Sequence, residues 1–219
     1  MGRLRRMKDP LLSEGSDKML RVTANTQLMR EIIDLLSVLA EEAKLVWGEK
    51  GLHTIVVDGS HVALLSATIG DECFETYEVE PVEIGIELSK MRDLLSLAGP
   101  EDLVEIDYDD AVGAINVRVG EVHRILRGLD VGTMTQPKTP ELTFNNSATI
   151  GSDKLSRALR AAKMVNELVN LSLDSTKMTI SADQEAGESV TVSFESGELS
   201  ELSSPSPTSS TSSLQFLDP

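Results

Sequence analysis

The order of structural elements that the sequence predicts occurs twice. The stretch MLRVTA begins a short strand at Met19, and the next stretch, NTQLMREIIDLLSVLAEEA, carries apolar residues at helical spacing after Thr26, a suitable helix cap. After residue 142 the order begins again, with a strand in NSATIG, a helix in SDKLSRALRAAKMV, and strands in LVNLSLD, KMTISAD and SVTVSF. A strand–helix–strands unit used twice predicts two domains of similar architecture.

A short match aligns the two copies. The segment His53–Asp58 (HTIVVD) parallels Met178–Asp183 (MTISAD), and a glutamate lies twelve residues before the threonine of each segment. We therefore expect these two strands to occupy equivalent places in the two domains.

The remaining patterns complete an α+β fold of antiparallel sheets and few helices. Strands are predicted in KLVWGEKGLHTIVVD, HVALLSATI, FETYEV and VEIGIEL, and a second helix in LSKMRDLLSLA ends at Gly99-Pro100. The stretches DLVEIDYDD and AINVRV predict a hairpin, and the Gly, Thr and Pro content of Glu121–Leu142 predicts a linker.

These patterns divide the chain into segments. We expect a disordered extension or a misplaced start over 1–18, a first domain over 19–122, a connecting strand and linker over 123–142, and a second domain over 143–219. The second domain has fewer elements than the first and contains a Ser/Thr-rich segment at 201–213. We expect it to be incomplete.

Composition excludes several classes of protein. The net charge of -16 arises from 36 acidic and 20 basic residues, which repels nucleic acid at long range unless a local basic surface exists. Aromatic residues make up 3%, too few for a base-stacking platform. The single cysteine, Cys73, rules out an intrachain disulfide and suits a reducing cytosol. No apolar run approaches the roughly 18 residues of a membrane span, and we expect neither a membrane partner nor a signal peptide.

Nothing in the sequence resembles a catalytic motif. Ser60 and His61 are neighbours in VDGSHVALL, so on an extended chain their side chains point to opposite sides. His53, His61 and His123 are scattered, and no phosphate loop, nucleophile elbow or Cys/His cluster occurs. We expect no enzyme activity, no cofactor and no metal site; a hydrolase using carboxylates would need a cleft with a perturbed acid.

The helix Ser152–Met164 carries a basic face. On a helical wheel its four cations fall on one half and its apolar residues on the other. In a chain this acidic, a uniformly basic face predicts a polyanion partner, and the lack of base-reading side chains predicts sequence-independent phosphate contact. The other two helices add three cations. The expected DNA-binding residues are Arg30, Lys90, Arg92, Lys154, Arg157, Arg160 and Lys163.

Three stretches together resemble the sliding clamps of the proliferating cell nuclear antigen family, most closely the archaeal DNA polymerase clamps. They are VDGSHVALL, AGPEDLVEID and GLDVGTMTQP, and the resemblance runs from about Met19 to the end. It implies duplicated DNA-clamp domains with antiparallel sheets outside and two helices inside. Two domains would form a subunit, and three subunits would close head to tail into a ring whose helices line a hole for duplex DNA.

The resemblance also implies an apolar pocket where partner proteins dock a short motif. In such clamps the pocket lies between the loop after the DGSH turn and the interdomain linker. His61 would be a wall of that site, although a loop histidine satisfied within its own turn remains an alternative. Gln136 departs from the family, which usually has an apolar residue there. The implied pocket residues are Val57, His61, Val62, Leu64, Leu129, Val131 and Met134.

Ring closure in the family pairs an edge strand of one subunit's first domain with an edge strand of the next subunit's second domain. The matching segments are expected to be 114–119 and 177–182, and the family's final helix, strands and tail are expected to be missing. The implied interface residues are Ala114, Ile115, Val117, Val119, Met178 and Ile180.

The expected function is that of a DNA sliding clamp subunit. It would encircle duplex DNA at the cytoplasmic nucleoid and tether DNA polymerase, nuclease and ligase through short docking motifs, after loading by a separate clamp loader. The alternative is an acidic protein-interaction module, a degenerate clamp paralogue, that binds partner peptides without encircling DNA. The basic helix is the feature that separates the two.

Overall fold

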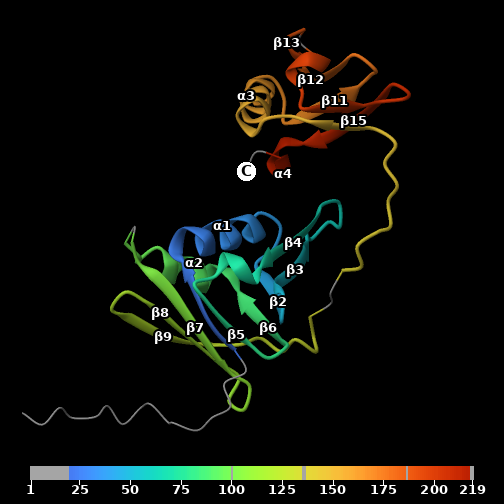
Figure 1. Ribbon diagram of the computed structural model, residues 1–219. Helices are drawn as coiled ribbons and strands as arrows, with labels where there is room; N and C mark the ends of the chain where they lie inside the picture. Colours follow the sequence, from blue (N-terminus) through green and yellow to red (C-terminus); the bar gives the residue numbers. More distant parts are fainter. Residues whose placement is uncertain (1–19, 100, 135–136, 186, 218–219) are drawn as a thin grey trace, which may run out of the picture. The chain divides into compact units, whose positions relative to one another are not determined.

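The computed structural model describes residues 20–99, 101–134, 137–185 and 187–217. The chain divides into two compact units, which we call unit 1 (residues 1–139) and unit 2 (residues 140–219) (Figure 1). Each is described by itself. The expected extension over 1–18 and Gln136 lie outside the described residues. No helix in the described part of the chain is long and apolar enough to cross a membrane.

Unit 1 contains two antiparallel sheets. The five-stranded sheet has the order β5 (Thr76–Val79), β1 (Leu20–Asn25), β7 (Leu103–Asp109), β8 (Ala114–Val119) and β9 (Val122–Arg127). The four-stranded sheet has the order β4 (Leu64–Gly70), β3 (Gly51–Val57), β2 (Glu42–Gly48) and β6 (Val82–Glu87). A short 3-10 turn, η1 (Asp71–Cys73), precedes β5.

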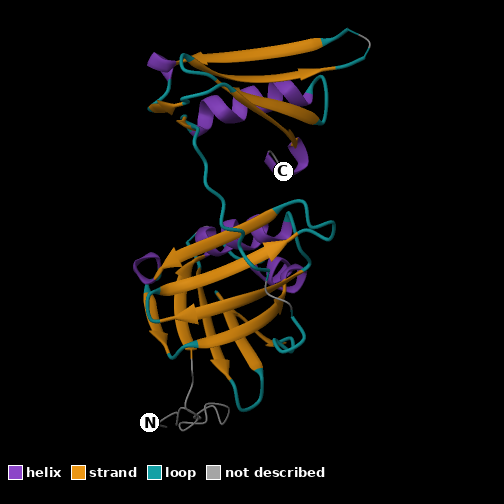
Figure 2. Ribbon diagram, turned by 90° about the vertical axis from the view of Figure 1, so that its right-hand side faces the viewer, coloured by secondary structure: helices purple, strands orange, loops and turns teal. Residues whose placement is uncertain are grey.

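Two helices, α1 (Thr26–Ser37) and α2 (Leu88–Leu95), lie next to each other on one side of these strands (Figures 1 and 2). The side chain of Asn25, not Thr26, caps α1 by accepting a hydrogen bond from the Gln27 N–H at 2.7 Å. Both helices are amphipathic, and their apolar faces are buried in the core.

The core of unit 1 is largely aliphatic and has one aromatic cluster. Trp47 is 1% exposed, and its ring centroid lies 5.7 Å from that of Phe74. The rings of Phe74 and Tyr77 are 5.1 Å apart, and the Tyr77 hydroxyl donates to the Gly48 carbonyl at 2.7 Å. These rings close one end of the space between the sheets.

Unit 2 is a smaller version of the same arrangement. Its four-stranded sheet has the order β13 (Ser189–Glu195), β12 (Lys177–Asp183), β11 (Leu168–Leu173) and β15 (Thr208–Ser213). A second sheet pairs β10 (Ser147–Thr149) with β14 (Glu201–Ser203). The helix α3 (Ser152–Lys163) packs on β11, β12 and β13, and the short elements η2 (Ser196–Glu198) and α4 (Leu214–Leu217) complete the unit.

The predicted duplication is confirmed, at a constant offset of 126 residues. Leu45 pairs with Thr54 and Ile84 in unit 1, and Leu171 pairs with Ile180 and Ser210 in unit 2, so that 45, 54 and 84 correspond to 171, 180 and 210. The helices α1 and α3 each have 12 residues and begin at 26 and 152.

The predicted match of His53 with Met178 is out of register by one residue. The pairing places Leu52, not His53, opposite Trp47, and the equivalent residue opposite Leu173 is Met178. The two segments were aligned on the Thr-Ile pair that both contain. The register of the strands is set instead by which side chains face the core.

The expectation that 114–119 and 177–182 are edge strands is wrong. β8 lies between β7 and β9, and β12 lies between β11 and β13. The expected interface residues Ile115, Val117, Val119 and Ile180 are at most 2% exposed, because they face the core of their own unit. Ala114 and Met178 are half-buried on the same two strands. The segment 121–142, whose pattern predicts a strand followed by a linker, supplies the true edge strand, β9.

Candidate functional site

The helix α3 has the basic face that its sequence predicts. Ala158, Leu159 and Ala162 are buried, whereas Arg157, Arg160 and Lys163 are exposed on the other side. The wheel arrangement follows directly from the 3.6-residue period. The fourth cation, Lys154, is half-buried.

Two of the cations of α3, Lys154 and Arg160, donate hydrogen bonds to backbone carbonyls. Lys154 Nζ donates to the Glu198 carbonyl at 3.0 Å, and Arg160 Nε donates to the Ser156 carbonyl at 3.4 Å. In the described part of the chain, neither Arg157 nor Arg160 forms an ion pair with a carboxylate. Their positive charge is therefore available to an external anion.

The three candidate cations of unit 1 have a different setting. Arg30 on α1 reaches the end of α2. One terminal nitrogen of its guanidinium donates to the carbonyls of Leu95 and Ala98, at 2.8 Å each. It caps the C-terminal end of that helix.

The two cations on α2 form ion pairs. Arg92 Nε lies 2.9 Å from Asp34 Oδ1 on α1, and Lys90 Nζ lies 2.5 Å from Glu87 Oε2. The Lys90 ammonium is the first cause of a lowered pKa at the Glu87 carboxyl, with help from a Ser89 hydrogen bond. Each cation of this pair of helices therefore has an intramolecular partner.

The loop after β3 is organised by one carboxylate, that of Asp58. Its Oδ2 accepts from the Ser60 N–H at 2.9 Å, and its Oδ1 accepts from the N–H groups of Val62 and Ala63 at 2.8 and 2.7 Å. The Ala63 hydrogen bond is the largest cause of a lowered pKa at Asp58; desolvation opposes it, and the hydrogen bonds from Ser60 and Val62 add to the lowering. Sequence reasoning did not single out this residue, although an Asp before Gly-Ser is typical of such a turn.

His61 is the exposed residue at the tip of this loop. Its φ of 57° lies in the left-handed region, and its N–H donates to the Asp58 carbonyl at 2.9 Å. Among the described residues, no group of His, Cys, Asp and Glu could hold a metal ion. The loop instead exposes His61 and Val62 to solvent, with Val62 73% exposed.

The linker after β9 is laid against β6. Leu129 forms a bridge with Gly85, with its N–H 2.9 Å from the Gly85 carbonyl. A Cβ at Gly85 would lie 2.7 Å from Met134 Sδ and 2.9 Å from Leu129 Cβ, so only glycine permits this close approach.

The structure brings some of the expected pocket residues together. Val57 and Met134 line one small cavity of about 100 Å³, and Val57 pairs with Leu64 across β3 and β4. His61, Val62 and Val131 do not line that cavity. Val131 is half-buried, between the linker residues Leu129 and Met134.

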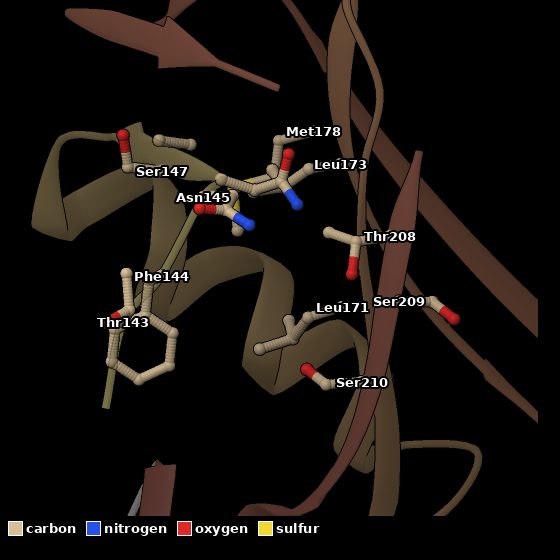
Figure 3. Close-up of a pocket in the computed structure, with 12 residues that line it drawn as sticks. Thr143, Phe144, Asn145, Ser147, Leu171, Leu173, Met178, Thr208, Ser209 and Ser210 are labelled. Atoms are coloured by element: carbon tan, nitrogen blue, oxygen red, sulfur yellow. The ribbon is translucent and has the colours of Figure 1, made fainter. Parts of the chain in front are cut away.

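Unit 2 contains a cavity of about 520 Å³, and one residue of its lining, Leu173, is the counterpart of Trp47 in the aromatic cluster of unit 1 (Figure 3). Leu171, Leu173 and Met178 form its apolar floor, and Ser210 faces them from β15. The equivalent residues of unit 1 are Leu45, Trp47, Leu52 and Ile84, which are all buried. Smaller and more polar side chains thus leave this end of unit 2 open.

The edge strands β9 and β13 carry opposite charges. β9 has exposed His123, Arg124 and Arg127 and a 64% exposed Ile125. β13 and the turn before it carry Glu188 and Glu195, both exposed. A basic edge and an acidic edge are suited to pair with each other in different copies of the chain.

Two copies of one unit, each with its helices on one side of antiparallel sheets, define the class of protein as a DNA-clamp fold. Residues 19–125 match the family described as proliferating cell nuclear antigen, N-terminal domain. The DNA polymerase sliding clamp of Methanocorpusculum labreanum is 31% identical over 168 residues, which cover 75% of this chain and 68% of the relative. That of Methanosarcina mazei is 28% identical over 192 residues, covering 84% and 78%.

Solved structures agree. The structure of A. fulgidus PCNA with the C-terminal region of FEN-1 bound has a TM-score of 0.84 at 25% identity, covering 91% of this chain and 81% of that one. PCNA from Thermococcus kodakaraensis has a TM-score of 0.81 at 19% identity, covering 91% and 83%, which shows the shared fold. The chain belongs to the proliferating cell nuclear antigen family of DNA polymerase sliding clamps.

Proposed function

We propose that this chain is a subunit of a DNA sliding clamp, a processivity factor that encircles duplex DNA and tethers DNA polymerase and other replication and repair enzymes. The basic face of α3 is the observation that carries the proposal. A chain with a net charge of -16 exposes Arg157, Arg160 and Lys163 on one helix, which is the local basic surface that duplex DNA requires.

The proposed contact is with phosphates and not with bases. The exposed face of α3 lacks the Asn and Gln side chains that read base edges, so binding is independent of sequence and sensitive to salt. A clamp has to move along DNA, and phosphate contacts repeat at every base pair. The role is non-catalytic, and a separate clamp loader would place the ring on DNA.

Partner proteins are proposed to dock beside the Asp58–Ala63 loop and the linker. The exposed Val62 and His61, with Leu64, Leu129, Val131, Met134 and Val57, offer apolar surface for a short motif with apolar anchors. The FEN-1 segment bound to the related A. fulgidus clamp supports such a site. The proposed partners are polymerase, nuclease and ligase, and a shared docking site raises their effective concentration on DNA.

Ring closure is proposed to join β9 of one subunit to β13 of the next. Among the described strands both lie at the edge of their sheet, and the exposed arginines of β9 would meet the glutamates of β13. Because the two surfaces differ, the contact is head to tail and can close into a ring, here a trimer.

The test is polymerase stimulation by a charge-reversed clamp. Lys154, Arg157 and Arg160 are changed together to Glu, and primer extension is measured with the clamp loader and polymerase present. We expect the stimulation to be abolished and the affinity for a partner peptide to stay within about twofold, because the docking loop lies on unit 1. Unaltered stimulation would contradict the role of α3 in lining the DNA and would favour the alternative, an acidic module that only binds partner peptides.

A further inference from the structure

The two structural repeats carry opposite charges at equivalent positions of their first helices. With the offset of 126 residues, Glu31 on α1 corresponds to Arg157 on α3, and Asp34 corresponds to Arg160. All four side chains are exposed. A surface that faces phosphates is thus basic in unit 2 and acidic in unit 1.

The cations near these acids do not restore a basic surface. Arg92 pairs with Asp34 at 2.9 Å, Lys90 pairs with Glu87 at 2.5 Å, and the Arg30 guanidinium is held by the carbonyls at the end of α2. Moving any of these cations to a phosphate would leave a carboxylate or a helix end without its partner. The exposed Glu31 and Asp93 would in addition face the DNA with like charge.

We infer that duplex DNA is held by α3 and not by the α1 and α2 surface of unit 1, which makes no lasting phosphate contact. This inference rests on the proposed clamp function. Around the bore of a ring, segments that attract the phosphates would alternate with segments that do not. At physiological salt, screening over about 8 Å confines each segment's effect to the phosphates next to it.

The alternation has a consequence for movement along DNA. Fewer phosphate contacts release fewer counterions, so the salt dependence of binding is shallow and the duplex is held loosely. The Arg92–Asp34 ion pair and the Arg30 hydrogen bonds join the two helices of unit 1 to each other and contribute nothing to DNA affinity.

The test compares matched double variants of the full chain for binding a fluorescent 30-base-pair duplex, by anisotropy across a series of KCl concentrations. R157A/R160A removes two cations from α3, and K90A/R92A removes two cations from α2. We expect R157A/R160A to weaken binding at low salt about tenfold or more and to reduce the slope of log K against log salt by about 2. We expect K90A/R92A to change affinity less than twofold.

A third variant, E31R, places on α1 the charge that α3 has at the equivalent position. It should raise affinity several-fold and steepen the salt dependence, a gain that misfolding cannot produce. Circular dichroism melting of each variant checks that it is folded.

The outcomes separate the inference from the proposed function. Equal losses for K90A/R92A and R157A/R160A would overturn the inference and leave a DNA-binding clamp standing. No change in E31R would also overturn it. If the unaltered chain gives no stimulation of primer extension with the clamp loader and polymerase present, the clamp function itself fails.

Discussion

Asp58 is the residue on which the docking surface depends most. One carboxylate accepts three backbone N–H groups, so it fixes the path of the chain from β3 to β4 and holds His61 in a left-handed conformation. Because the loop is ordered before a partner arrives, binding does not have to include the cost of ordering it.

Removing the Asp58 carboxylate should weaken partner docking. Asp58→Ala loses all three hydrogen bonds, and we expect a loss of roughly fivefold in affinity for a short partner peptide, measured by calorimetry. Asp58→Asn is the matched control, because its single oxygen can still accept from Val62 and Ala63; its affinity should fall between the two. Equal affinity for all three proteins would show that the loop order is irrelevant to docking.

The loop should respond to pH only in strong acid. The pKa of Asp58 is lowered from its ordinary 3.8, so its hydrogen bonds are fully present above that value and are lost as pH falls through the lowered one. We expect the amide shifts of Val62 and Ala63 in nuclear magnetic resonance spectra to be constant from pH 7 to 5. A change within that range would contradict the control of this loop by the Asp58 carboxylate.

At the scale of elements, the two units differ most at the open end of unit 2. Trp47 and Ile84 fill the equivalent space in unit 1, whereas Leu173 and Ser210 leave a cavity of about 520 Å³. Poorly filled space forfeits dispersion contacts, so this end of unit 2 is packed less tightly than its counterpart in unit 1.

Partial filling should therefore stabilise unit 2. Ser210→Ile adds apolar volume at the position of Ile84, and we expect a gain of about 1 kcal/mol in its unfolding free energy, measured by thermal melting of the full chain. Thr211→Ile, one residue along β15 and outside the cavity lining, controls for strand propensity. A lower melting temperature for Ser210→Ile alone would contradict the description of this space as underfilled.

The local sequence pattern predicted most of the helices and strands but little of how they are arranged in the fold. The helical period of α3 placed its basic and apolar residues on the correct faces, because the buried face of an amphipathic helix follows from the spacing of its own apolar residues. Sheet order was missed, since alternation in AINVRV marks a strand but cannot show that β9 will cover its edge. The partners of Arg30 and Arg92 were also hidden, because Leu95 and Asp34 lie 65 and 58 residues away in the chain.

At the scale of the whole molecule, assembly depends on the charges of two sheet edges. Arg127→Glu should repel the glutamates of β13 and lower the solution mass toward one chain, seen by light scattering. Lys50→Glu, in the turn between β2 and β3, makes the same change of charge away from both edges and should leave the mass unaltered. A monomer for both variants would indicate general charge repulsion and contradict the β9–β13 contact.

The central claim is that copies of this chain form a ring able to surround DNA. Light scattering after size exclusion, at low and high salt, measures this directly. We expect a mass near three chains of 23.7 kDa at low salt, with partial dissociation at high salt because the charged edges are screened. A folded monomer of 23.7 kDa at every salt concentration would contradict it.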